Sequence, residues 1–259
     1  MNEASPRNNQ IKRVGFILLE IGSILMSSGA STERVRRTVQ RIANSFNYKA
    51  ELFITFSALS ITVINPRGSD TYNGIKRTPS HTVNFKTVSG ISRMSWAVAE
   101  EKWTVDQIRH ELSRLNALPH YSRYITLPLV GLAGAAFCRF AGGTVSDLLI
   151  VFVATVAGLF VRQEITKLKF NQYLCIYFAS FTASLIAGLS VKLGMGGNHE
   201  HAFATSVLFL IPGVPLINSF SDVIDGNLQN ALIRGLHGFV ISFAIALGLL
   251  TSMILYKFS

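Results

Sequence analysis

Charged residues are scarce in this sequence. Asp, Glu, Lys and Arg make up 15% of the 259 residues, whereas hydrophobic residues make up 49%. Soluble globular domains carry about 25% charged residues, so the low charge disfavours an ordinary soluble protein and indicates a membrane protein. The charge is also uneven: residues 1–123 hold 17 basic and 9 acidic residues, against 7 and 5 in residues 124–259. The sequence thus predicts a polar, basic amino-terminal part followed by a lipid-compatible part.

Cysteine is rare as well. Cys138 and Cys175 each lie inside an apolar run without the spacing of metal ligands, so neither a disulfide framework nor a metal site is expected. The sequence His199-Glu200-His201 lacks the i, i+4 spacing of a zinc-binding helix, and we interpret it as solvated or pH-responsive. No Ser-His-Asp or Cys-His set, Gly-rich phosphate loop or Walker motif can be assembled. An enzyme or an ATP-driven pump is therefore disfavoured, no cofactor is expected, and any transport would draw on an ion or substrate gradient.

The basic excess has two interpretations. Nucleic-acid binding is disfavoured because the sequence lacks a Lys/Arg stripe interleaved with aromatic residues. The basic residues instead flank apolar segments, as the positive-inside rule describes for cytoplasmic parts of membrane proteins. Arg7, Lys12 and Arg13 precede an apolar stretch that imitates a secretory signal. Glu20 in the middle of that stretch favours a retained cytosolic helix over a cleaved signal.

The amino-terminal part predicts helices and strands together. Residues 11–26 and 33–46 predict a helical hairpin, with Gly29 as a left-handed C-cap and Ser31 or Thr32 as the N-cap of the second helix.

Strands are predicted from the β-branched and aromatic stretch 52–64, which stops at the turn signal 65–68, and from the alternating stretch 82–88. A third strand is expected near 71–76. A short helix is expected at 90–99, and Thr104 and Gln107 predict a capping box for a helix to about residue 115. Residues 1–120 are therefore expected to form a small cytosolic α+β domain.

The pattern changes at Pro119, after which apolar runs of spanning length begin. The runs are 124–141, 145–161, 173–191, 202–217 and 236–256. Residues 121–259 are thus predicted to form a domain of five transmembrane helices. The loop with Arg162, Lys167 and Lys169 is expected in the cytoplasm, whereas the loop 194–198 carries no charge. The five spans and the loop charges predict an inner-membrane protein whose amino terminus is cytoplasmic and whose carboxyl terminus is outside. The absence of an internal repeat suggests that the chain is only part of a transport pathway.

The fourth run carries the most informative segment. Pro212 and Pro215 remove two backbone donors and Gly213 relaxes the backbone between them, so a broken helix is expected. Helix ends exposed by such a break suit an anionic substrate group. The candidate substrate-binding residues are Pro212, Gly213, Pro215, Asn218, Ser219 and Asp222. The alternative is a helix that ends at the membrane interface, with Asp222 and Asp225 in a cytosolic loop.

Ionisable residues close to the apolar runs are candidates for a proton or charge relay. These are Arg139, Asp147, Asp222 and Arg234. For Arg139 the alternative is snorkelling to the lipid headgroups. Arg162 and Arg234 could bind a carboxylate, but both sit where ordinary positive-inside anchors belong.

Three motifs together resemble the threonine/serine exporter (ThrE) family. They are Gly29-Ala30-Ser31-Thr32-Glu33-Arg34-Val35, Cys138-Arg139 with Gly142-Gly143, and the stretch from Ser206 to Asn218. The resemblance runs nearly end to end and is closest to the larger subunit of the split, two-component form. It implies a cytosolic amino-terminal domain, five transmembrane helices and a small transmembrane partner subunit that completes the permease.

The resemblance favours the broken-helix interpretation and leaves the substrate open between amino acids and dicarboxylates. Asp222 could pair with an ammonium group, and Arg139 or Arg234 with a second carboxylate. The leading hypothesis is a subunit of a secondary-active exporter of small carboxylates, such as threonine, serine or succinate, across the inner membrane. The alternative is a membrane-anchored ligand-sensing or scaffold protein without transport activity, and self-association into a homo-oligomer is left open.

Overall fold

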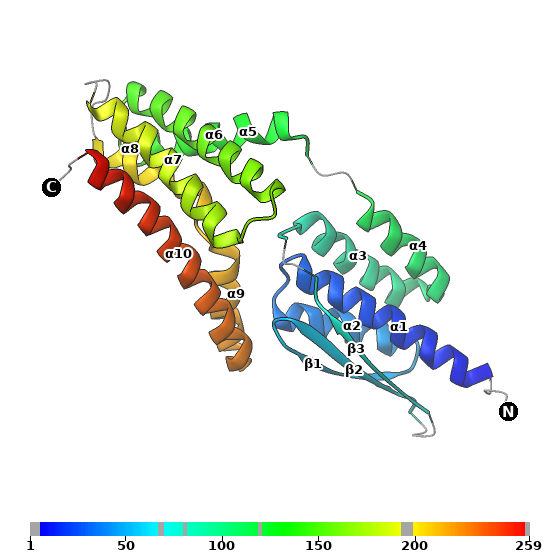
Figure 1. Ribbon diagram of the computed structural model, residues 1–259. Helices are drawn as coiled ribbons and strands as arrows, with labels where there is room; N and C mark the ends of the chain where they lie inside the picture. The colour runs from blue at the N-terminus through cyan, green and yellow to red at the C-terminus, as the bar shows by residue number, and fades with distance from the viewer. Residues whose placement is uncertain (1–5, 67–69, 80–81, 119–120, 193–198, 257–259) are drawn as a thin grey trace. The chain divides into compact units, whose positions relative to one another are not determined.

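The computed structural model describes residues 6–66, 70–79, 82–118, 121–192 and 199–256 (Figure 1). The chain forms two compact units. The first comprises Met1–Pro119 and Val214–Gly235, and the second comprises His120–Gly213 and Leu236–Ser259. The helix α10 (Leu228–Tyr256) therefore begins in the first unit and continues in the second.

The first unit contains a three-stranded sheet and four helices before α9. These elements are α1 (Pro6–Ser27), α2 (Thr32–Ser45), β1 (Lys49–Ile54), β2 (Ala58–Ile64), β3 (Thr71–Arg77), α3 (Phe85–Glu101) and α4 (Val105–Asn116). The strands are antiparallel in the order β1-β2-β3. The helices α1 and α2 pack against the sheet, and α3 and α4 pack against the helices, as Figure 1 shows.

One face of the sheet supplies the core of this unit. Along β2 the buried residues are Leu59, Ile61 and Val63, which alternate with partly exposed ones, as expected when one face packs on helices and the other meets solvent. The α1 side of the core is fully buried at Ile17, Leu18 and Ile21 among others. Burying each such side chain stabilises the fold by about 1.5–3 kcal/mol before entropy is counted.

The structure confirms the predicted helix ends. Gly29 has φ +90°, and the amides of Gly29 and Ala30 donate to the carbonyls of Met26 and Leu25, which is the Schellman pattern of a left-handed cap. The Ser31 side chain accepts from the amide of Arg34 at the start of α2. Thr104 and Gln107 form the capping box of α4.

Two strand predictions are wrong. The stretch 52–64 is two strands, because a tight turn at Thr55, closed by its amide on the carbonyl of Ala58, folds it back on itself. The stretch 82–88 is not a strand. Asn84 accepts from the amide of Thr87 and caps α3, which begins at Phe85. The segment therefore leads into a helix that Asn84 caps, although its alternating polar and apolar residues favoured a strand. The third strand is confirmed as β3, and the turn expected at 65–68 lies partly outside the described residues.

The second unit is helical and apolar. Its elements are α5 (Arg123–Phe140), α6 (Val145–Lys167), α7 (Gln172–Lys192), α8 (His199–Ser206), η1 (Leu208–Leu210) and the later part of α10. Small residues let the helices approach closely. A Cβ on Gly158 would lie 2.9 Å from the carbonyl oxygen of Ala179, and one on Gly248 would lie 2.7 Å from that of Tyr177. Such contacts are typical of helix packing in membranes.

Three described helices are long and apolar enough to cross a membrane: α6, α7 over Gln172–Leu189, and α10. A bent pair, His201–Leu210 followed by Gly213–Ile224, makes a fourth if it is a single span. The first predicted span, α5, is 18 residues long but carries Arg123 and Arg139 near its ends, and it is not among them. The structure therefore supports a helical membrane protein with three to four spans, and five spans remain a prediction.

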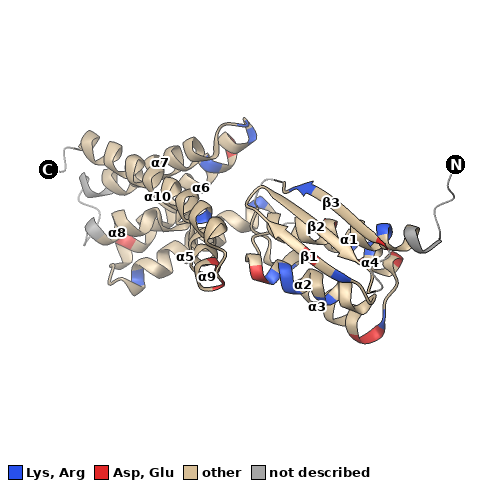
Figure 2. Cartoon of the chain, turned by 90° about the horizontal axis from the view of Figure 1, so that it is seen from below, with Lys and Arg blue, Asp and Glu red and all other residues tan. Residues whose placement is uncertain are grey.

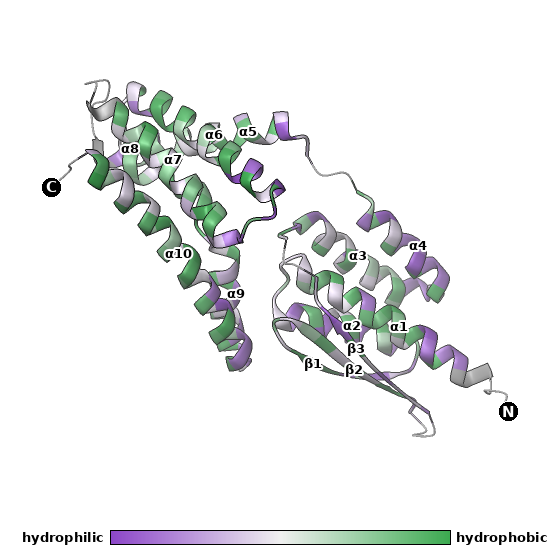
Figure 3. Cartoon of the chain, in the orientation of Figure 1, coloured by the Kyte–Doolittle hydropathy of each residue, from purple (hydrophilic) through white to green (hydrophobic). Residues whose placement is uncertain are grey.

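Charge and hydropathy agree with this arrangement. Charged residues are few in the helices of the second unit and lie mostly near helix ends (Figure 2). Figure 3 shows α10 as mainly hydrophobic along its length. Large apolar side chains face outward on these helices, among them Leu149, Val153, Phe239 and Phe243, as expected for contact with lipid tails. The uncharged loop 194–198 lies outside the described residues.

Candidate functional site

The helix break is where the prolines predicted it. After η1, Ile211 and Pro212 are not helical, and α9 (Gly213–Ile224) begins at Gly213. Pro215 lies in the first turn of α9, where a missing backbone N–H costs little. This confirms the broken-helix interpretation. Asp222 lies within α9 and is completely buried, so the alternative of a solvated loop is wrong for this residue.

A tight turn joins α9 to α10 in a helical hairpin. Gly226 has φ +76°, and the amides of Gly226 and Asn227 donate to the carbonyls of Val223 and Asp222, again a Schellman cap. Within the hairpin, the Ser219 hydroxyl donates to the carbonyl of Ala231 at 2.7 Å. Asp225 lies just past the end of α9 and is exposed.

The hairpin has one polar and one apolar face. Asn218 and Asp222 are four residues apart on α9, as are Asn230 and Arg234 on α10, so each pair lies on one helix face. The other face of α9 exposes Ile217, Phe220 and Ile224. The polar face is the one that packs within the first unit.

Asp222 and Arg234 form a buried ion pair. Arg234 Nη1 lies 3.0 Å from Asp222 Oδ2, in a contact that is an ion pair rather than a linear hydrogen bond. The other carboxylate oxygen, Oδ1, accepts from the backbone amide of Thr32 at 3.3 Å. Thr32 is the first residue of α2, whose amino end carries free N–H groups and a positive dipole end. The carboxylate is therefore compensated by a guanidinium and by a helix terminus.

The same polar face binds the loop that precedes α2. The Asn218 amide donates to the carbonyl of Gly29 at 2.9 Å, and Arg234 Nη2 donates to that of Ala30 at 3.2 Å. Asn230 donates to the Thr32 hydroxyl at 3.4 Å and to the carbonyl of Ile54, at the end of β1, at 2.9 Å. The Gly29–Thr32 loop and the hairpin thus form one polar cluster, which we call the loop–hairpin cluster.

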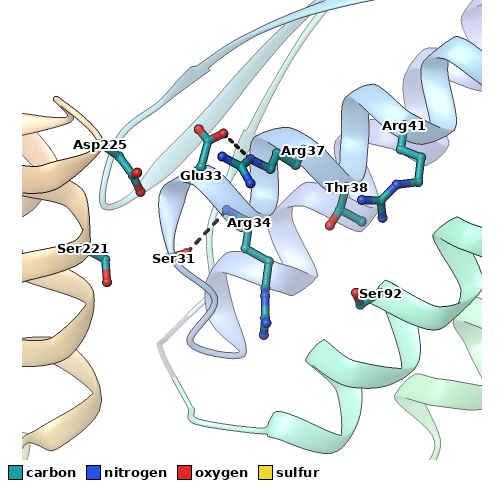
Figure 4. Close-up of a pocket in the computed structure, with 9 residues that line it drawn as sticks. All are labelled: Ser31, Glu33, Arg34, Arg37, Thr38, Arg41, Ser92, Ser221 and Asp225. Carbon is teal, nitrogen blue, oxygen red and sulfur yellow. Dashed lines mark hydrogen bonds and ion pairs between the residues drawn. The ribbon is translucent and has the colours of Figure 1, made fainter.

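A pocket opens beside this cluster (Figure 4), with a volume of about 320 Å³. It is lined by Ser31, Glu33, Arg34, Arg37, Thr38, Arg41, Ser92, Ser221 and Asp225. The arginines come from α2, Ser92 from α3, and Ser221 and Asp225 from α9 and its end. The α2 wall of the pocket therefore carries three arginines and one glutamate, and the end of α9 adds an aspartate.

The structure brings only part of the predicted site together. Asn218, Asp222 and Arg234 meet in the loop–hairpin cluster, and Ser219 and Pro215 lie on the same helix α9. Pro212 and Gly213 belong to the second unit, at the helix break.

The relay candidates Arg139 and Asp147 also belong to the second unit, at the turn between α5 and α6. Arg139 donates to the carbonyl of Gly143 at 3.1 Å. Asp147 is buried and forms the capping box of α6 with Thr144, accepting from its amide at 2.8 Å. Their observed contacts hold this turn together, and a relay role for them remains a prediction.

Sequence reasoning missed Thr32, Asn227 and Asn230 as partners of the site. Asn227 accepts from Arg36 of α2 at 3.2 Å. The signal available was the recurrence of polar residues at 227, 230 and 234, with helical spacing, at the start of an otherwise apolar helix. In the described part of the chain, no three His, Cys, Asp or Glu residues gather as metal ligands. The side chains of His199 and Glu200 lie outside what the structure describes.

Comparison with known proteins gives relatives over nearly the whole length. The chain is 22% identical over 247 residues to the "Probable succinate transporter subunit YjjP" of Klebsiella aerogenes, covering 95% of each chain. It is 22% identical over 248 residues to the "Probable threonine/serine exporter" of Mycobacterium tuberculosis, of which it matches 46%. No solved structure matches.

A family model described as "Putative threonine/serine exporter" matches residues 17–256. The match includes both halves of the loop–hairpin cluster and nearly all described helices. The chain therefore belongs to the threonine/serine exporter family, which is a family of membrane transporters and not of enzymes.

Proposed function

We propose that the chain is one subunit of a secondary-active exporter that moves small carboxylates across the inner membrane. The substrates would be amino acids of the threonine and serine type or dicarboxylates such as succinate. The observation that carries the proposal is the buried pair of Asp222, on α9, and Arg234, in the second turn of α10, a helix that is long and apolar enough to cross a membrane. A charge pair is costly to bury, and a helix that serves only as an anchor needs none.

The helix break supplies the place for substrate. Pro212, Gly213 and Pro215 interrupt the backbone, and the polar side chains of α9 follow within three turns. In the observed structure Asn218, Ser219 and Asp222 all have protein partners. Substrate binding along Pro212–Asp222 would therefore exchange some of these bonds. A substrate carboxylate can replace Asp222 as the partner of Arg234, and a proton or a substrate ammonium can replace Arg234 as the partner of Asp222.

A second membrane subunit is part of the proposal. Relatives that are matched over 95% and 97% of their length are named as transporter subunits, whereas this chain matches 46% of the longer threonine/serine exporters. A small transmembrane partner would supply the remainder. Residues 1–120 are proposed as the cytosolic domain and residues 121–259 as the domain with five spans, with the amino terminus inside and the carboxyl terminus outside.

The proposal is tested by efflux from liposomes that hold the chain with and without its partner subunit. We expect export only from the pair, and we expect Asp222→Asn to abolish or strongly reduce it while the protein stays inserted. Asp225→Asn is the comparison, because Asp225 is an exposed aspartate three residues further along. Full export by the chain alone would contradict the two-component arrangement. Unchanged efflux in Asp222→Asn would remove this residue from the mechanism.

A ligand-sensing membrane protein remains the second candidate because the first unit holds a charged pocket of about 320 Å³. Such a protein would bind ligand without moving it. Intracellular accumulation of amino acids or dicarboxylates in cells that lack the chain distinguishes the two functions, since only the loss of an exporter causes it directly.

A further inference from the structure

The pocket beside α2 holds charged side chains that have no oppositely charged partner among the described residues. Arg37 is paired with Glu33 at 2.6 Å. Arg41 donates to the Ser95 hydroxyl at 2.8 Å and lies over the Trp96 ring, 3.7 Å from its centroid, and has no acidic partner among the described residues. The guanidinium of Arg34 has no hydrogen bond or ion pair within the described chain. Two of the three arginines, Arg34 and Arg41, therefore have no acidic partner in the part of the chain that the structure describes.

The opposite wall carries the complementary feature. Asp225 lines the pocket from the end of α9 and has no cationic partner in the part of the chain that the structure describes. Figure 4 shows Arg34 extending from α2 into the space bounded by Ser221 and Ser92. The hydroxyl groups of Ser92 and Ser221 thus lie on either side of the Arg34 guanidinium, and the Asp225 carboxylate lies on the same α9 wall as Ser221.

We propose that this pocket is a binding site for small carboxylates, in which Arg34 binds the ligand's carboxylate. The charge of Asp225 would attract or repel the group at the other end of the ligand. A guanidinium presents paired donors that match a carboxylate, and the volume is within the range of ligand pockets. An ammonium group at the other end would be attracted to Asp225, and a second carboxylate would be repelled. The choice of ligand class rests on the proposed function.

The site is distinct from the loop–hairpin cluster but adjoins it. Ser31 caps α2 and lines the pocket, and the next residue, Thr32, binds Asp222. Ser221 lines the pocket and directly precedes Asp222 on α9. A ligand in the pocket would therefore lie next to residues that bond to the buried ion pair.

Trp96 offers a direct reporter of binding. The chain has two tryptophans; the other, Trp103, bonds to Glu101 and lines a different surface hollow. In a Trp103→Phe background, emission comes from Trp96 alone, whose ring contacts the pocket residue Arg41. A ligand that attracts Arg41 should change that emission.

The experiment titrates the purified full-length Trp103→Phe protein in detergent with disodium succinate, with L-threonine, and with sodium chloride at the ionic strength of the succinate series. We expect saturable changes with the carboxylates and none with sodium chloride. Arg34→Gln should weaken binding about tenfold or more, and Arg34→Lys should restore part of it. Arg109→Gln removes the same charge from an exposed position on α4 and should have no effect. Asp225→Asn should weaken threonine binding and tighten succinate binding, each by about two- to fivefold.

Several results would overturn the inference. These are no saturable response to either carboxylate, an equal response to sodium chloride, and identical titrations for Arg34→Gln and Arg109→Gln. A shift of both ligands in the same direction by Asp225→Asn would reject the role of Asp225. Binding is measured without the partner subunit or a gradient, so it is independent of export. If the protein exports substrate with its partner but binds no carboxylate in this titration, the pocket proposal is rejected and the proposed function stands. If it binds carboxylates but does not export them, the proposed function is rejected and the pocket proposal stands.

Discussion

The ion pair between Asp222 and Arg234 should be detectable as a large coupling energy. Its closest atoms are 3.0 Å apart and both side chains are buried. At an effective dielectric constant of 20, two unit charges at that distance attract by roughly 5 kcal/mol. Removing one partner leaves the other charge buried and uncompensated, which typically costs about 3–5 kcal/mol. Asp222→Asn and Arg234→Gln should each destabilise the first unit by about this amount.

The double variant should be far less damaged than either single one. Replacing both charges removes the desolvation cost along with the attraction, so Asp222→Asn/Arg234→Gln should retain stability within about 1–2 kcal/mol of the parent. The coupling energy, obtained from the four proteins together, should therefore be about 4 kcal/mol or more.

Tryptophan fluorescence during heating measures this unit specifically, because both tryptophans, Trp96 and Trp103, belong to it. A loss of 3–5 kcal/mol corresponds to a fall in Tm of about 10–20 °C. The exposed Asp225→Asn serves as the control and should shift Tm by less than about 2 °C. Additive losses in the double variant would show that the two charges do not interact, and unchanged single variants would show that water reaches both.

Three further predictions concern the rest of the chain. Gly29→Ala should destabilise the first unit by about 1–2 kcal/mol, because φ at this residue is +90°, and the same fluorescence measurement checks it. Gly248→Val should separate α7 from α10 and lower the yield of monodisperse protein in size-exclusion chromatography, because its side chain would meet the backbone of Tyr177 and Phe181; Ala246→Val, at an exposed position two residues away, should leave the yield unchanged. A reporter that works only outside the inner membrane should be active when it is fused after Ser259. If a reporter that works only in the cytoplasm is active at this position instead, the five-span topology is refuted.

Local chemistry made the helix ends predictable. Each predicted helix cap depends on groups only a few residues away in the sequence. The structure has these caps at the predicted positions, Gly29, Ser31 and the Thr104–Gln107 capping box. The break at Pro212 belongs to the same class, because a missing N–H acts on its own helix. The strand predicted at 82–88 failed because two local signals competed there. The Asn84 side chain accepts a hydrogen bond that stabilises the start of a helix. A strand with alternating polar and apolar residues is stabilised only when a neighbouring strand pairs with it.

The loop–hairpin cluster could not be predicted because its partners are far apart in sequence. Thr32 and Asp222 are separated by 190 positions, and Asn230 and Ile54 by 176. The sequence indicates that Asp222 needs a compensating group, and Arg234 is another charged candidate. The spacing of the two residues does not predict that they contact each other. Arg34 belongs to the Gly29–Val35 motif, but an arginine on an amphipathic helix is usually solvated, so the sequence alone does not mark it as a ligand-binding residue.

The arrangement of the cluster restricts how the proposed exporter can work. Asp222 and Arg234 neutralise each other, so neither is available to a substrate until something replaces its partner. A proton on Asp222 would leave Arg234 as an unpaired buried cation, which a substrate carboxylate would then stabilise, so proton binding and carboxylate binding at this pair should favour each other. The neutral double variant separates this coupling from simple stability. It should fold because both charges are removed together, yet it has neither a group to protonate nor a guanidinium to bind the carboxylate, so it should be inactive. Full efflux from that stable variant would show that the pair only fastens the hairpin to the loop before α2, and would leave the break at Pro212 as the remaining candidate for the transport site.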